Sequence, residues 1–350
     1  MRPLLAATAL LLVCALVAAG VTLAVLRIES RTNTQQVNLR TGVSITEESA
    51  IIAAASKARP AVVSIITQHQ PTVVRGSGYL ATSDGYIVTS INVIAGANGL
   101  TVLLQGDSRS HEARLVDYDC QTGVAVIKVD KVSGLPTLAF ADPNALQQGQ
   151  VIVAVGGPVD GGAITPGYVS AMHREASTRD PLNLGHQLQF SDTIQTSAAI
   201  DDGTSGGPIL NVGSQVVGIA MVSPTQLAGF GLNVADIQDD VQQILSTGTV
   251  VVASLGATTS DVTPETAALG GLPQGAQVVT VDKGGPAAIA GLQAGDVITQ
   301  VDDVKVDAAH PLSLLLRSRF HADQRVTVSY TRGTSSTQAE LKLTGQHPTC

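Results

Sequence analysis

A serine lies between glycines in the segment Asp201–Pro208, which reads Asp-Asp-Gly-Thr-Ser-Gly-Gly-Pro. Gly203, Gly206 and Gly207 carry no Cβ, so the backbone here can turn tightly and direct successive N–H groups toward one point. Such donors beside a nucleophilic hydroxyl would stabilise the oxyanion that forms during acyl transfer. The segment predicts Ser205 as a nucleophile, with the backbone N–H groups of Gly203 and Ser205 as an oxyanion hole. The same residue types also form ordinary loops between strands, so the rest of the chain must decide.

Short apolar runs with glycine-rich turns surround this loop and predict a mainly β fold. Such runs recur at roughly 8–12-residue spacing, which is typical of a β-sandwich or a pair of β-barrels. A parallel α/β sheet would need amphipathic helices between its strands, and we find no such pattern there. The expected strands cover 62–66, 76–82, 86–90, 100–104, 112–117, 123–129, 151–155, 194–196 and 215–221.

Composition excludes several classes of function. The chain of 350 residues is long enough for two folded domains and a leader. Its net charge is −8 with only 20 Lys and Arg and no basic run, so it carries no electrostatic footprint for nucleic acid. Three cysteines, Cys14, Cys120 and Cys350, have a spacing that predicts neither a zinc site nor a disulfide framework. A bridge between Cys120 and Cys350 would have to join two domains and is the less favoured alternative. The sequence implies no metal ion and no organic cofactor.

The N-terminal region predicts a membrane segment. Residues 3–26 contain no charge, and Leu4–Leu26 is almost wholly apolar. At about 1.5 Å per residue this run spans roughly the 30 Å hydrocarbon core, and it is long for a secretory signal. An uncleaved single-pass anchor is therefore favoured over a cleaved signal peptide. Charge alone leaves the orientation open, because arginines flank both ends of the segment.

A polar linker follows the apolar segment, and a short helix follows the linker. The linker is rich in Thr, Asn and Gln and shows no periodicity. Ser44–Glu47 fits the capping-box pattern ahead of an Ala- and Ile-rich run, which predicts a helix over Ser49–Lys57. Pro60 is expected to end it.

Five blocks, in order, resemble the trypsin-like domain of the HtrA/Deg serine proteases. The resemblance implies two six-stranded β-barrels with a Ser-His-Asp triad in the cleft between them. The blocks are Gly76–Gly78, Asp84–Thr89, Gly123–Val129, Gly203–Pro208 and Val216–Ala220.

The resemblance also locates the two residues that should activate the serine. The family carries its histidine directly after a Gly-Tyr-Ile-x-Thr strand, and Asn92 holds that position here. It carries its aspartate at the start of an Asp-Leu-Ala-Val-Leu-Lys strand, and Gly123 holds that position. An amide has no useful basicity and glycine has no side chain, so only Ser205 of the triad remains. Losing the base and its orienting partner typically costs about a million-fold in turnover, on the order of 8 kcal/mol.

Another residue could in principle replace the missing base, but the sequence favours none. Asp201 and Asp202 lie near Ser205, where we expect them to face solvent or to cap the turn. The barrel domain has four histidines, and none occupies a position that the family places at the cleft. They are His69, His111, His173 and His186.

The region from about Val250 resembles the PDZ domain that follows the protease in this family. A strand over Gly275–Val281 and a following Gly-Gly-Pro segment carry the resemblance. PDZ domains bind an extended peptide C-terminus by strand addition, with backbone N–H groups on its carboxylate. The resemblance places the carboxylate loop at Leu255, Gly256 and Ala257 and the groove helix at Pro311–Ser318. The leucines of that helix (Leu312, Leu315 and Leu316) are better explained as core.

These observations predict an α+β PDZ domain (250–345) after a trypsin-like double β-barrel domain (47–247), a linker (29–46) and a transmembrane helix (1–28). We expect a cell-membrane protein with both folded domains outside the cytoplasm. Its function would be that of a catalytically impaired pseudoprotease that binds unfolded or C-terminal peptides. The alternative is an active HtrA-type endopeptidase of protein quality control with an unrecognised general base. The resemblance also suggests a homotrimer, or a hetero-oligomer with an active homologue.

Overall fold

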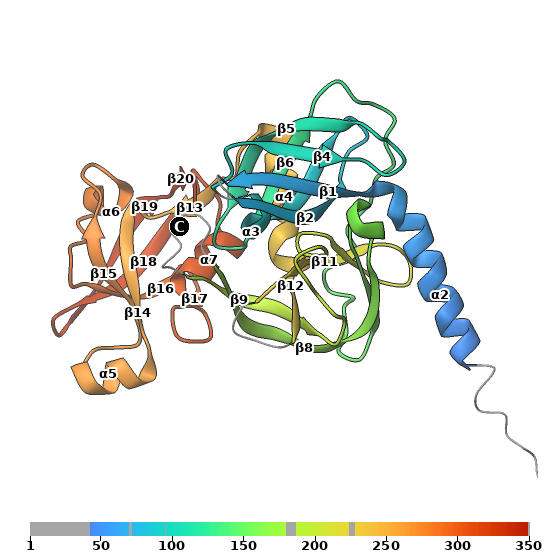
Figure 1. The fold of residues 1–350 in the computed structure, drawn as a ribbon. Helices are drawn as coiled ribbons and strands as arrows, with labels where there is room; N and C mark the ends of the chain where they lie inside the picture. Colours follow the sequence, from blue (N-terminus) through green and yellow to red (C-terminus); the bar gives the residue numbers. More distant parts are fainter. Residues whose placement is uncertain (1–42, 70–71, 95, 180–186, 224–227, 349–350) are drawn as a thin grey trace, which may run out of the picture. The chain divides into compact units, whose positions relative to one another are not determined.

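The computed structural model describes residues 43–69, 72–94, 96–179, 187–223 and 228–348. Within them the chain has a mainly β, trypsin-like fold followed by a PDZ domain, as predicted (Figure 1). The predicted transmembrane helix and most of the linker lie outside the described residues. In the part of the chain that is described, no helix combines the length and the apolar character that a bilayer crossing requires.

The first barrel closes through antiparallel strands in the order β1-β2-β3-β6-β5-β4. β1 pairs with both β2 and β4, which closes the sheet on itself. Its interior is aliphatic, since only 3% of the chain is Phe, Trp or Tyr, and Ile65, Ile87 and Val126 are fully buried. The strands are β1 (Val62–His69), β2 (Thr72–Leu80), β3 (Tyr86–Ser90), β4 (Leu100–Leu103), β5 (Ser110–Asp119) and β6 (Val124–Val129).

The second barrel has the order β10-β11-β12-β9-β8-β7. Its longest pair, β8 with β9, shows several register shifts, so the two strands bend strongly along their length. The loop of Ser205 connects β9 to β10. The strands are β7 (Val151–Val155), β8 (Ile164–Arg179), β9 (Gln187–Thr196), β10 (Pro208–Leu210), β11 (Val216–Met221) and β12 (Gly229–Asn233), and a short 3-10 turn, η2 (Val159–Gly161), precedes β8.

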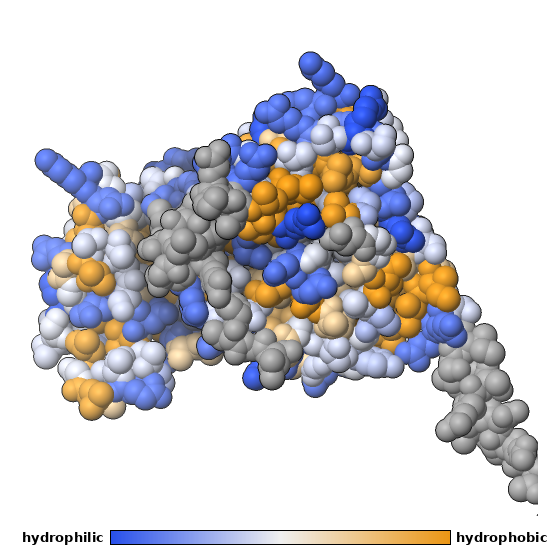
Figure 2. All heavy atoms as spheres, viewed as in Figure 1, coloured by the Kyte–Doolittle hydropathy of each residue, from blue (hydrophilic) through white to orange (hydrophobic). Residues whose placement is uncertain are grey.

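Two longer helices belong to the barrel domain. Helix α2 (Val43–Ala58) begins at Val43 rather than at the predicted Ser49. The residues of the predicted capping box, Ser44–Glu47, are part of the helix instead. A 3-10 turn, η1 (Arg59–Ala61), follows it. Helix α4 (Val234–Thr247) was not predicted. The Asn233 side chain caps its first turn, and its buried face packs against β5 and β6 as well as β11 and β12. In Figure 2 the apolar side chains over this domain form patches that hydrophilic residues interrupt.

The PDZ domain is built on a sheet with the order β14-β15-β16-β18-β19, in which β17 also pairs with β16. β14 is an edge strand, and β13 pairs separately with β20. Its strands are β13 (Val252–Ser254), β14 (Ala257–Val262), β15 (Gly275–Val281), β16 (Val297–Val301), β17 (Val304–Lys305), β18 (Arg325–Arg332), β19 (Ser335–Lys342) and β20 (Thr344–Gln346). Its helices are α5 (Pro264–Gly270), α6 (Pro286–Ile289) and α7 (Leu312–Ser318).

Cys120 lies in the turn between β5 and β6 and is disulfide-bonded. Its partner lies outside the described residues. The expectation that the cysteines form no disulfide is therefore wrong, because distance along the sequence does not limit which thiols meet in a folded chain.

Candidate functional site

Two predicted site residues from different barrels meet in the structure. Asn92 lies in α3 (Ile91–Ile94), a single turn that directly follows β3, and its neighbours Ile91, Val93 and Ile94 are buried in the first barrel. With these apolar side chains anchoring the turn, Asn92 Nδ2 donates a hydrogen bond of 2.9 Å to Ser205 Oγ. The two side chains are therefore as close as a nucleophile and its general base must be, although Asn92 stands where the family has a histidine.

The amide of Asn92 holds the serine without activating it. Nδ2 is a donor, so it engages a lone pair of the hydroxyl oxygen and cannot take its proton. Asn92 Oδ1 is buried and has no hydrogen-bond partner among the described residues. Exchanging the two amide atoms would make Oδ1 an acceptor for the hydroxyl, but an amide oxygen is not basic near neutral pH. Neither orientation supplies a general base.

Gly123, at the position of the triad aspartate, is enclosed. Its φ is +81°, in the region that favours glycine, and its carbonyl accepts a hydrogen bond of 2.8 Å from the N–H of Ile91. A Cβ on Gly123 would lie 2.7 Å from Cε1 of Phe190 and 3.1 Å from Cδ2 of Leu232. The Phe190 ring from β9 thus fills the space that a carboxylate side chain would need. No local sequence signal predicts this contact, because only the fold brings Phe190 to Gly123.

The loop of Ser205 is closed by its own hydrogen bonds. The Asp201 carbonyl accepts the N–H groups of Ser205 (2.9 Å) and Thr204 (3.1 Å). Asp201 Oδ1 accepts both the N–H (2.8 Å) and the hydroxyl (2.9 Å) of Thr204. Asp201 therefore caps the turn, as expected, and Asp202 is exposed. The Ser205 amide, one of the two predicted oxyanion donors, is used inside the loop in this conformation.

Ser77 of β2 ties this loop to the first barrel. Its N–H donates to the Ser205 carbonyl (2.8 Å), and its Oγ donates to the Gly203 carbonyl (2.6 Å) while accepting from the Gly157 N–H (2.7 Å). A Cβ on Gly206, whose φ is +81°, would lie 2.4 Å from the Ser77 carbonyl oxygen. In the sequence Ser77 belongs to one of the blocks that resemble the family; in the structure it supports the serine loop.

The described histidines of the barrel domain have partners other than Ser205. His111 Nε2 contacts the carboxylate four residues before it, at 3.0 Å. His173 Nδ1 contacts the carboxylate of Asp192 at 3.1 Å. The side chain of His69 and the whole of His186 lie outside the described residues. Among those described, none contacts the nucleophile position.

The predicted peptide-binding loop precedes the edge strand of the PDZ sheet. Leu255 is buried in the PDZ core, and Gly256 has φ +68° with no room for a Cβ, which would lie 2.8 Å from Cδ of Pro286. Ala257 begins β14, whose other edge pairs with no strand of the described chain. An extended peptide could therefore add to that edge.

The leucines of α7 mostly belong to the core, as predicted. Leu312 and Leu315 are buried in the PDZ core, and Leu316 packs against it. Leu314 faces outward and is 46% exposed. The helix is therefore anchored by its buried leucines and presents little apolar surface.

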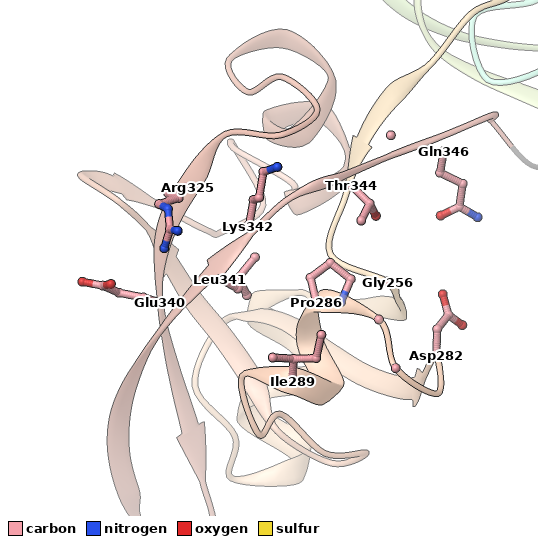
Figure 3. A pocket seen from close by; sticks show the side chains of 13 residues that line it. Gly256, Asp282, Pro286, Ile289, Arg325, Glu340, Leu341, Lys342, Thr344 and Gln346 are labelled. Atoms are coloured by element: carbon pink, nitrogen blue, oxygen red, sulfur yellow. The ribbon is translucent and has the colours of Figure 1, made fainter.

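A hollow of about 580 Å³ lies on the PDZ domain between α6 and the strands β19 and β20 (Figure 3). Gly256, from the predicted peptide-binding loop, contributes to its wall. Side chains of both charges line it, among them Arg325 and Glu340, and Ile289 supplies an exposed apolar contact. The carboxylate loop therefore borders open space on the α6 side.

Comparison with known proteins agrees with this architecture. Residues 76–219 match the model of a trypsin-like peptidase domain, and residues 253–343 match that of a PDZ domain. A probable periplasmic serine endoprotease, DegP-like, from Halomonas elongata is 39% identical over 249 residues, which cover 69% of this chain and 50% of that protein. A relative of the same name from Rickettsia conorii is 30% identical over 291 residues, covering 81% and 56%. The chain spans about half the length of these curated relatives.

Solved structures extend the similarity to nearly whole chains. The HtrA-type protease AlgW, solved with a tripeptide, is 30% identical with a TM-score of 0.66; the match covers 85% of this chain and 98% of that one. AlgW with a decapeptide gives 28% identity and a TM-score of 0.69, over 85% and 99%. A serine endoprotease from Yersinia pestis gives 26% and 0.64, over 85% and 98%. Both domain matches and the similarity over nearly the whole of AlgW thus agree, and the chain belongs to the HtrA-type family of trypsin-like serine proteases.

Proposed function

We propose that this chain is an HtrA-type pseudoprotease whose barrel domain is catalytically impaired and whose PDZ domain binds unfolded or C-terminal peptides. One observation carries the impairment: the residue that contacts Ser205 Oγ at the position of the base is Asn92, which donates to it. Phe190 adds to this by occupying the place of the triad carboxylate. A serine without base or orienting partner keeps little of its turnover.

Peptide binding is assigned to Leu255, Gly256 and Ala257 together with the edge of β14. Three observations support it: β14 is an edge strand, the domain matches a PDZ model, and the related AlgW was solved with peptides. Main-chain hydrogen bonds along β14 would give affinity, and amides of the loop would take the terminal carboxylate.

An extracytoplasmic location, with one N-terminal membrane anchor, completes the proposal. The curated relatives are named as periplasmic, and disulfides such as that of Cys120 persist in oxidising compartments. The apolar run Leu4–Leu26 would supply the anchor. A homotrimer or a hetero-oligomer with an active homologue is the assembly that we expect.

The test is proteolysis by the full chain in detergent. Unfolded casein and a fluorophosphonate probe are offered to the native protein and to Ser205→Ala. We expect no casein cleavage that depends on Ser205. Cleavage that disappears in Ser205→Ala would overturn the pseudoprotease proposal.

The second candidate is an active serine endopeptidase, favoured by the names of the relatives. It needs a general base other than Asn92, and the described histidines have other partners. Peptide titration separates the two candidates. A pseudoprotease should bind peptides ending in a free carboxylate, more weakly when they are amidated, and leave them intact, whereas an endopeptidase should cut them.

A further inference from the structure

Arg317 reaches from helix α7 of the PDZ domain to the barrel domain. Its Nη1 lies 3.0 Å from each carboxylate oxygen of Asp240. Its Nη2 donates to the carboxylate of Asp119 and, at 3.1 Å, to Oε1 of Gln121. One guanidinium thus joins the PDZ helix to both α4 and the turn that follows β5.

The two carboxylates need such a cation. The Asp119 side chain is fully buried and that of Asp240 is 5% exposed, and the Arg317 side chain that meets them is 15% exposed. Thr122 adds a hydroxyl donor to Asp240 at 2.8 Å. Two like charges withdrawn from water repel one another, and a planar guanidinium can pair with both at once.

A separate set of contacts joins the same region of the barrel domain to the other end of the PDZ domain. Asp117 accepts the N–H of Val250 at 2.7 Å and the hydroxyl of Thr249 at 2.8 Å. Its other oxygen lies 2.9 Å from Nε2 of His347, whose ring packs edge-on against Tyr118. The interdomain segment and the residue that follows β20 therefore meet the end of β5, whose last residue, Asp119, Arg317 also contacts.

We propose that Asp119 and Asp240 form an intramolecular docking socket and that Arg317 is the latch that holds the PDZ domain in it. The latch stands independently of peptide binding and of proteolysis. It also has a direct neighbour in the candidate site, because the Asp119 carbonyl accepts the Gly123 N–H at 2.8 Å. The groove helix and the turn at the triad position are thus held by one ionic cluster.

The cluster should also respond to protons. Burial, and then the charge of Asp119, raise the pKa of Asp240 to about 7, although Arg317 opposes the shift. Asp236 lies on the same face of α4. Burial, and then the charge of Asp192, raise its pKa to about 7, while Arg317 and His173 oppose the shift. Undocking removes the charge of Arg317, which lowers both pKa values, so the undocked carboxyls should titrate above about 7. Docking therefore releases protons and should strengthen as the pH rises above about 7.

Hydrogen exchange of the full chain, read by mass spectrometry, tests the latch. We expect Arg317→Ala to accelerate exchange of the amides in 117–123 and 249–251 by at least about tenfold. Arg319→Ala is the matched control, because Arg319 is exposed at the end of the same helix. Arg317→Lys keeps the charge but not the two-sided geometry and should fall between them.

Three outcomes would overturn the latch. The first is exchange in Arg317→Ala that equals that of Arg319→Ala. The second is acceleration spread equally over β1–β4, which would mean general destabilisation. The third is additive effects of Arg317→Ala and Asp240→Asn, since a true pair is coupled. The proton effect is tested separately: after correction for intrinsic exchange, these amides should exchange more slowly at pH 8.5 than at pH 6.5, and Asp240→Asn should flatten that difference. An unchanged pH dependence in Asp240→Asn would remove the proton linkage.

Discussion

The two sides of the candidate catalytic site depart from the family pattern in different ways. On the side of the second barrel, the loop of Ser205 keeps its glycines and its bonds to Ser77. On the side of the first barrel, Asn92 replaces a base by an amide that still reaches the serine, whereas the place beyond Gly123 is filled by Phe190. One change preserves the shape of the site and the other closes it. In the proposed pseudoprotease, the first change would impair catalysis through its chemistry and the second through its packing.

The largest effect, on casein cleavage, is expected from removing the Phe190 ring that fills the space beside Gly123. Asn92→His with Gly123→Asp should give little activity, because the new side chain meets Phe190 and sits at an unfavourable φ. Adding Phe190→Ala should raise casein cleavage by on the order of a thousand-fold or more, part of the million-fold that a full triad supplies. The turnover of the double and triple variants is compared, with Ser205→Ala in the triple background as control.

That triple variant removes a core ring, so its folding must be checked by circular dichroism; a Phe→Ala change typically costs about 3–5 kcal/mol. Equal activity of the folded double and triple variants would contradict a steric role for Phe190.

A second prediction concerns the Ser205 loop, the side of the site that keeps the family pattern, and its support by Ser77. Ser77→Ala removes the hydroxyl that supports Gly203 and leaves the buried Gly157 N–H without its acceptor. We expect the free energy of unfolding to fall by about 1–3 kcal/mol, the usual cost of an unsatisfied buried group. Urea unfolding measures it, with the exposed Ser108→Ala of the same barrel as control. A change no larger than that of Ser108→Ala would show that the loop does not depend on Ser77.

The smallest effect is expected at Asn92. Asn92→Ala deletes one hydrogen bond to Ser205 and should cost about 0.5–1.5 kcal/mol of stability. Like the native protein, it should show no Ser205-dependent casein cleavage, since the amide supplies no base. The same urea titration and casein assay report both quantities. A fall in Ser205-dependent cleavage would mean that Asn92 takes part in catalysis and would favour the endopeptidase candidate.

Sequence reasoning reached the elements with local signals and failed where distant segments meet. Short apolar runs predicted a β-sandwich or a pair of barrels, and the family resemblance supplied the two barrels and the position of Asn92. Helix α4 was missed although its signals were present: Asn233 as a cap, then apolar residues at 234, 237, 241 and 244. Phe190 against Gly123 and Arg317 between Asp119 and Asp240 had no such signal, because residues far apart in sequence become neighbours only through the fold.

The packing of Phe190 against Gly123 bears on how readily the proposed pseudoprotease could regain proteolysis. In the genetic code, Asn to His and Gly to Asp are each one nucleotide change. At Gly123, however, the first step would introduce a clash and backbone strain before any benefit appears. A return to activity would have to pass through a smaller residue at 190, which weakens the core and has no catalytic value by itself. Two neutral or harmful steps must precede the third, which brings the first gain, so the proposed inactive site should be far easier to reach by mutation than to leave.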